Sequence, residues 1–72
     1  MYTIHYGDIA EEYSSLKEMW QQGDGIPVAT RSYTAIVLGY PVYITKDDEV
    51  IAEINEDTVL NSLFCDLIKT YE

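Results

Sequence analysis

The first six residues alternate between two kinds of side chain, with Tyr2, Ile4 and Tyr6 on one side of an extended chain and more polar residues on the other. An alternation with a period of two is typical of a β-strand. Gly7 interrupts the pattern, as glycine often does where a strand ends. We therefore expect a short strand over residues 1–6.

The pattern after this strand becomes helical. Asp8 is followed three residues later by Glu11, which is the spacing of a capping box at the start of a helix. Apolar residues then recur at spacings of four, three and four, on one helical stripe: Ile9, Tyr13, Leu16 and Trp20. Gly23 is suited to end such a helix. We predict a helix at about residues 8–22, followed by a loop over residues 23–27.

In the central part of the chain the period returns to two, and β-branched and aromatic residues accumulate. Three strands are predicted there, at about residues 30–38, 41–45 and 50–55. Residues 39–40, a glycine followed by a tyrosine, fit the two-residue turn of a type II′ hairpin, because the glycine supplies the positive φ.

The length of the next turn can be inferred from parity. With a two-residue turn, Glu53 would lie on the same face as the core residues Val42 and Ile44, and burying an unpaired carboxylate costs several kcal/mol. An odd turn, such as residues 46–48, aligns apolar residues with them instead: Val50, Ala52 and Ile54. We expect the odd turn.

The widest apolar stripe lies near the C-terminus, where the spacing is again helical. Its members are Val59, Leu60, Leu63, Phe64, Leu67, Ile68 and Tyr71. Asn55 is placed to cap this helix, and Glu56 and Asp57 suit the positive end of its dipole. We predict a helix over about residues 56–71.

These elements predict one domain over residues 1–72, in the order β-α-β-β-β-α. The expected class is α+β, with two helices on one face of a three- to four-stranded, mainly antiparallel sheet. A chain of 72 residues is short for a comfortable single core, which favours efficient packing or a partner chain.

Charge narrows the possible partners. The chain has 13 acidic and 4 basic residues, a formal net charge of −9, yet 47% of its residues are hydrophobic. That apolar content argues against a disordered acidic chain. The four basic residues are scattered and outnumbered, so direct binding to nucleic acid is disfavoured.

The sequence offers little for catalysis or for a metal. His5 is the one histidine and Cys65 the one cysteine, so neither an internal disulfide nor a closed zinc site can form. The two residues are expected on different elements, which disfavours a Cys–His nucleophile pair. The acidic run at 47–49 lacks the glycine and the spaced ligands of a calcium-binding loop. We predict a non-enzymatic protein without cofactor or metal.

The chain has no apolar run of the roughly 20 residues that a membrane span requires. Its first residues have neither the basic nor the apolar region of a secretory signal. The expected location is the cytoplasm, without a membrane partner.

The acidic residues are expected to form two sets. One set belongs to the first predicted helix and consists of Asp8, Glu11, Glu12 and Glu18; the other lies at the end of the last hairpin and consists of Asp47, Asp48, Glu49 and Glu53. Such an array can substitute for the phosphates of a duplex and compete for a basic groove. The alternative is that acidity serves solubility alone.

Seven tyrosines are the other unusual feature. Interfaces favour tyrosine because it combines a large contact area with a polar group, although strand propensity also enriches it. We include Tyr43 in the partner-binding set, together with Glu11, Glu12, Glu18 and the residues 47–49 and 53.

A short acidic chain with mixed α/β patterning, many tyrosines and no catalytic motif resembles the small phage-encoded inhibitors, which include anti-CRISPR proteins and other nucleic-acid mimics. The two acidic sets carry this resemblance. It implies stoichiometric binding to a basic nucleic-acid-binding protein or nuclease complex, in the host cytosol if the chain is phage-encoded. Those inhibitors share no fold, so the resemblance transfers no site.

A second hypothesis is a small structural or assembly module. In the predicted sheet, an apolar and tyrosine-containing outer face would be available for a homodimer or a larger complex: Ile36, Leu38, Tyr43 and Ile51.

Overall fold

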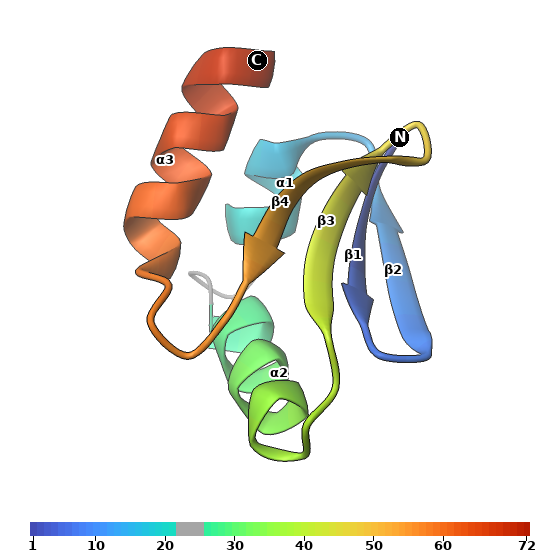
Figure 1. Ribbon diagram of the computed structural model, residues 1–72. Coiled ribbons are helices and arrows are strands. Elements are labelled where there is room, and N and C mark those ends of the chain that lie inside the picture. The colour runs from blue at the N-terminus through green and yellow to red at the C-terminus, as the bar shows by residue number, and fades with distance from the viewer. Residues whose placement is uncertain (22–25) are drawn as a thin grey trace.

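The computed structural model describes residues 1–21 and 26–72, so the predicted helix stop at Gly23 and most of the predicted loop lie outside the described residues. Four antiparallel strands form one sheet in the order β2-β1-β3-β4 (Figure 1). The strands are β1 (Tyr2–Tyr6), β2 (Ile9–Tyr13), β3 (Val42–Lys46) and β4 (Glu49–Ile54). The helices are α1 (Leu16–Gln21), α2 (Ile26–Val37) and α3 (Leu60–Tyr71).

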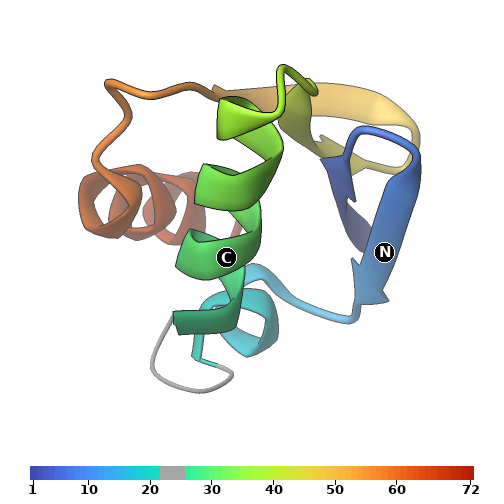
Figure 2. The ribbon, with the colours of Figure 1, turned by 90° about the horizontal axis from the view of Figure 1, so that it is seen from below.

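The three helices lie on one side of the sheet (Figure 2). The predicted α+β class with an antiparallel sheet is confirmed. The described elements, however, follow the order β-β-α-α-β-β-α, and two segments adopt the opposite kind of structure from the one predicted.

The first of these segments was predicted as one helix over residues 8–22. Its first part is instead strand β2, which pairs with β1 from Tyr6↔Ile9 to Tyr2↔Tyr13. Gly7, with a φ of +65°, takes the turn between the two strands. The prediction was wrong because a spacing of four, as between Ile9 and Tyr13, also places two residues on one face of a strand.

Helix α1 starts with an N-cap of its own, Ser15, seven residues after the predicted N-cap. The hydroxyl oxygen of Ser15 accepts a 3.0 Å hydrogen bond from the backbone N–H of Glu18. The Glu72 carboxylate, at the far end of the chain, accepts the N–H groups of Leu16 and Lys17. The first turn of this short helix is thus satisfied partly by the end of α3.

The second segment was predicted as a strand over residues 30–38, and it is helix α2. Its buried face carries small side chains at helical spacing, Val28, Ser32 and Ala35, so the helix can approach the sheet closely. Pro27 lies in its first turn, where proline is tolerated. Tertiary packing thus outweighs the β propensity of the segment.

The predicted type II′ hairpin at residues 39–40 is also wrong, because the segment before it is helix α2 and not a strand. Gly39, with a φ of +85°, ends α2 instead. Its N–H donates to the carbonyl of Ile36 at 3.0 Å, and the N–H of Tyr40 donates to that of Ala35 at 2.8 Å. These two bonds form a Schellman motif, which places glycine at C′.

The predicted strands at 41–45 and 50–55 are confirmed as β3 and β4, with small shifts at their ends. The turn between them has two residues, Asp47 and Asp48, both with positive φ, as in a type I′ hairpin. The odd residue expected in the turn is found in a bulge instead, at the register shift between Ile44 and Thr45. Val42 therefore faces Ile54, Ile44 faces Ala52, and Glu53 is exposed, as the parity argument required.

The predicted C-terminal helix begins later than expected, at Leu60 rather than at 56, and its N-cap residue, Val59, makes no side-chain cap. The Asn55 side chain closes the preceding turn by accepting bonds from Asp57 and Thr58. Trp20 of α1 stacks on Phe64 of α3 at 4.6 Å. The core lies between the sheet and the helices and includes Ile4, Leu16, Met19, Ile44 and Phe64, all without exposed surface.

Candidate functional site

The face of the sheet opposite the helices is the first candidate surface. Strand alternation and the observed register place on it Thr3, His5, Ala10, Glu12, Tyr43, Thr45, Val50 and Glu53. None of these eight positions holds lysine or arginine. Glu12 on β2 and Glu53 on β4 are separated by three inter-strand spacings, about 14 Å across the sheet. We call this surface the open face.

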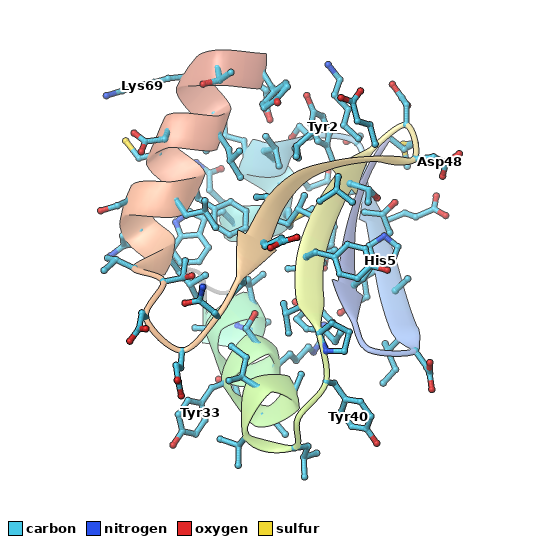
Figure 3. The ribbon with its side chains drawn as sticks, in the orientation of Figure 1. Tyr2, His5, Tyr33, Tyr40, Asp48 and Lys69 are labelled. Atoms are coloured by element: carbon cyan, nitrogen blue, oxygen red, sulfur yellow. The ribbon has the colours of Figure 1, made fainter. Side chains whose placement is uncertain are left out.

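The centre of the open face is built from aromatic and hydroxyl groups. The rings of His5 and Tyr43 stack at 4.4 Å with an interplanar angle of 9°. His5 Nε2 lies 3.0 Å from the Thr45 hydroxyl, at hydrogen-bond distance. His5 points away from the helices in Figure 3. Three cross-strand side chains are therefore held in fixed positions between the two glutamates.

One end of the sheet extends this acidity. Asp47 and Asp48 form the β3–β4 turn and Glu49 begins β4, and all three are exposed. Asp47 forms an ion pair with the amino group of Met1 at 3.0 Å. Asp48 lies at the tip of the hairpin (Figure 3). The predicted hairpin-end set therefore stands at one end of the open face, with Glu53 further along β4.

The predicted helical set is not one set. Glu11 and Glu12 are neighbours on β2 and so point to opposite faces of the sheet. Glu11 lies on the helix side, where it accepts a hydrogen bond from the Arg31 guanidinium. Glu18 lies on α1 and accepts a 2.6 Å bond from the Ser14 hydroxyl. Of the predicted partner-binding residues, Glu11 and Glu18 are thus separated from the open face.

The predicted assembly face is also not found as one surface. Ile36 is part of α2, and Leu38 follows that helix. Ile51 packs against the core. Only Tyr43 of the four predicted residues lies on the open face, because the strand predicted over residues 30–38 is a helix and Ile51 lies at the bulge of β4.

A second surface was missed by the sequence reasoning. A groove with a volume of about 810 Å³ lies between the β1–β2 hairpin and α2. Its apolar lining includes the exposed side chains of Ile9, Leu38 and Tyr40. Its charged lining consists of Asp8, Glu11 and Arg31. The sequence signal that could have indicated this groove is Gly7. The turn at Gly7 folds β2 back beside β1 and so brings Glu11 to Arg31.

Tyr6 also lines this groove, and its hydroxyl is buried. Burial, followed by the negative charge of Glu11 and the neighbouring Tyr13, raises the pKa of Tyr6 well above its usual range. Its phenol therefore stays neutral at physiological pH and can both donate and accept a hydrogen bond. The hydrogen bond and the charge of Glu11 likewise raise the pKa of Arg31.

The structure does not bring His5 and Cys65 together. Cys65 is exposed on α3, which lies on the helix side of the sheet (Figure 2), whereas His5 belongs to the open face. Within residues 1–21 and 26–72, no three histidine, cysteine, aspartate or glutamate side chains are placed to hold one metal ion. In the same ranges, no helix has the length and apolar character needed to cross a membrane.

Comparison with known proteins finds no matching family model, no matching curated protein and no matching solved structure. The open face and the groove are therefore the features from which a function can be inferred.

Proposed function

We propose that the chain is a non-enzymatic, cytoplasmic inhibitor that binds a basic, nucleic-acid-handling protein through the open face and the adjoining β3–β4 turn. The observation that carries the proposal is that the charged side chains of this surface are all carboxylates, with Asp47 paired to the amino group of Met1. Glu12 and Glu53 stand on a face without lysine or arginine, and the turn at its end adds Asp48 and Glu49.

Charge of one sign on a rigid sheet suits the mimicry of nucleic acid. Carboxylates fixed by strand geometry can meet the lysine and arginine residues that otherwise contact phosphates. The stack of His5 on Tyr43 gives the surface an aromatic centre, which is a common feature of protein interfaces. Because exposed charges steer encounter, association is expected to be fast and sensitive to salt.

The test is affinity capture of a partner from the host cytosol, followed by competition of the captured protein with DNA and with RNA. Salt provides a second readout, because the Debye length falls from about 10 Å at 0.1 M to about 3 Å at 1 M. Affinity that barely changes over this range would contradict charge mimicry.

A matched pair of variants then tests the surface. The triple variant E12Q/D48N/E53Q removes three carboxylates of the open face and its turn, and E18Q/E56Q/D66N removes the same formal charge elsewhere. If each lost contact contributes about 0.5–1 kcal/mol, the first variant binds the captured partner roughly 10–100-fold more weakly. The second retains most of the affinity. Equal losses in both variants would show that only net charge matters and would refute the assignment of this face.

A further inference from the structure

The groove between the β1–β2 hairpin and α2 combines an apolar wall with an acidic end. Its wall includes Ile9, Leu38 and Tyr40, each more than half exposed. Two carboxylates, Asp8 and Glu11, line it against one guanidinium, that of Arg31. The groove therefore has a formal charge of −1 within a protein of charge −9. Its electrostatic preference is for a cation with an apolar stem.

Tyr6, which lines this groove, has an unpaired hydroxyl. Tyr6 is only 6% exposed, and its hydroxyl has no hydrogen-bond partner among the described residues. Buried polar groups are usually paired, because an unpaired one loses its hydration without compensation. A donor that reached this oxygen would supply the missing bond.

Arg31 is the cation that already lines this groove. Its guanidinium bonds Glu11, while 51% of its side chain is exposed. Exposed ion pairs of this kind contribute little to stability. The internal guanidinium can therefore be exchanged for an external cation, with Arg31 released to solvent.

We propose that this groove receives one basic side chain, arginine or lysine, of the protein's partner, in exchange for Arg31. The stem of the incoming side chain lies along Ile9, Leu38 and Tyr40. Its cation bonds Glu11 near Asp8 and reaches the hydroxyl of Tyr6. This inference depends on the proposed function only in taking the partner to be basic. It adds a specific anchor to a surface that otherwise acts through distributed charge.

The experiment needs no partner. The ¹⁵N-labelled chain is titrated with the N-acetyl methylamides of arginine and lysine, and with that of citrulline as a neutral isostere of arginine. At least one cationic probe is expected to give saturable amide shifts at Gly7, Ile9, Leu38 and Tyr40, with little effect from citrulline. Equal binding of citrulline, or shifts that neither saturate nor cluster at the groove, would overturn the proposal.

Variants test the exchange itself. E11Q is expected to weaken the cationic probe about tenfold, the effect of one lost charge-assisted hydrogen bond, and E18Q, with the same charge change on α1, leaves the affinity unchanged. Y6F keeps the ring and also weakens binding. R31Q tightens binding, because it removes the competitor. A loss of binding in R31Q, together with acetate shifting the same amides, would identify an anion site and refute the proposal.

The two proposals fail separately. Binding of the probes to the groove, with no effect of E12Q/D48N/E53Q on partner capture, would leave the groove assignment intact and refute the open face. A salt-sensitive partner that depends on the open face, with no probe binding, would refute the groove alone.

Discussion

Two glycines with positive φ allow a quantitative test of the fold at the edge of the groove. Gly7 and Gly39 have φ values of +65° and +85°, so alanine at either site is strained by roughly 1–2 kcal/mol. Their surroundings differ. A Cβ on Gly39 meets nothing within 4 Å, whereas one on Gly7 lies 3.0 Å from Cγ and 3.1 Å from Cβ of Tyr40.

The contacts at Gly7 involve the root of the Tyr40 side chain, which cannot rotate away without moving its backbone. That backbone is held near Gly7, whose N–H donates to the carbonyl of Pro41 at 2.8 Å. Overpacking of this kind costs a further ~1–3 kcal/mol. We therefore expect G7A to lose about 2–5 kcal/mol and G39A about 1–2 kcal/mol, against a total stability of about 4–11 kcal/mol for a chain of this length.

The assay is urea denaturation followed by the fluorescence of Trp20, the one tryptophan of the chain, which stacks on Phe64 in the interior. The Y40A background supplies the internal control, because removing the ring relieves most of the overlap. G7A should cost about 1 kcal/mol less there than in the wild type. A G39A loss as large as that of G7A, or no coupling to Tyr40, would refute the reasoning.

Two further predictions concern the core and the loss of stability at alkaline pH. Phe64→Ala, at a side chain with no exposed surface, should cost about 3–5 kcal/mol by urea denaturation, whereas Val59→Ala, at an exposed position, should change stability by less than about 0.5 kcal/mol. The raised pKa of Tyr6 means that the folded chain holds this proton more tightly than the unfolded chain. Its contribution is complete below the ordinary pKa of about 10 and is lost as pH rises above it, by up to about 1.4 kcal/mol per pH unit. Y6F should flatten this loss between about pH 9 and pH 11; an unchanged slope would show that Tyr6 is not the group responsible.

The elements that the sequence predicted well are those whose own local pattern of apolar residues fits one kind of structure. The β3–β4 hairpin follows from a local alternation, and parity correctly excluded burial of Glu53 even though a bulge, rather than the turn, supplies the odd residue. The wide stripe around Phe64 and Leu67 likewise identified α3. In both cases the pattern of apolar residues and the final packing agree.

The elements that failed are those whose local pattern fits two kinds of structure. Glu11 faces the helix side of the sheet, where its hydrogen-bond partner is Arg31, twenty residues later in the chain. The segment of α2 is rich in β-branched residues, and its helical form rests on the small buried side chains of Ser32 and Ala35 against the sheet. Local signals were also ambiguous, since Gly39 suits both a hairpin turn and a helix end.

The candidate surfaces show the same division. Residues 47–49 and Glu53 were grouped correctly because one hairpin contains them. The grouping of Glu11 with Glu18 failed because it assumed a continuous helix. The groove was not predictable from local patterns, since it requires the hairpin turn at Gly7, the helix α2 and the loop at Tyr40 to meet.

Because the helices lie on one side of the sheet, the two faces of the sheet can accept substitutions differently during evolution. Along β1 and β3, one set of alternate residues is buried in the interior, while positions such as Glu12 and Glu53 make no contribution to it. Substitutions at those positions alter what the surface presents without altering what holds the chain together. The scaffold can therefore acquire a different binding specificity through changes on one face, while its folding determinants stay constant.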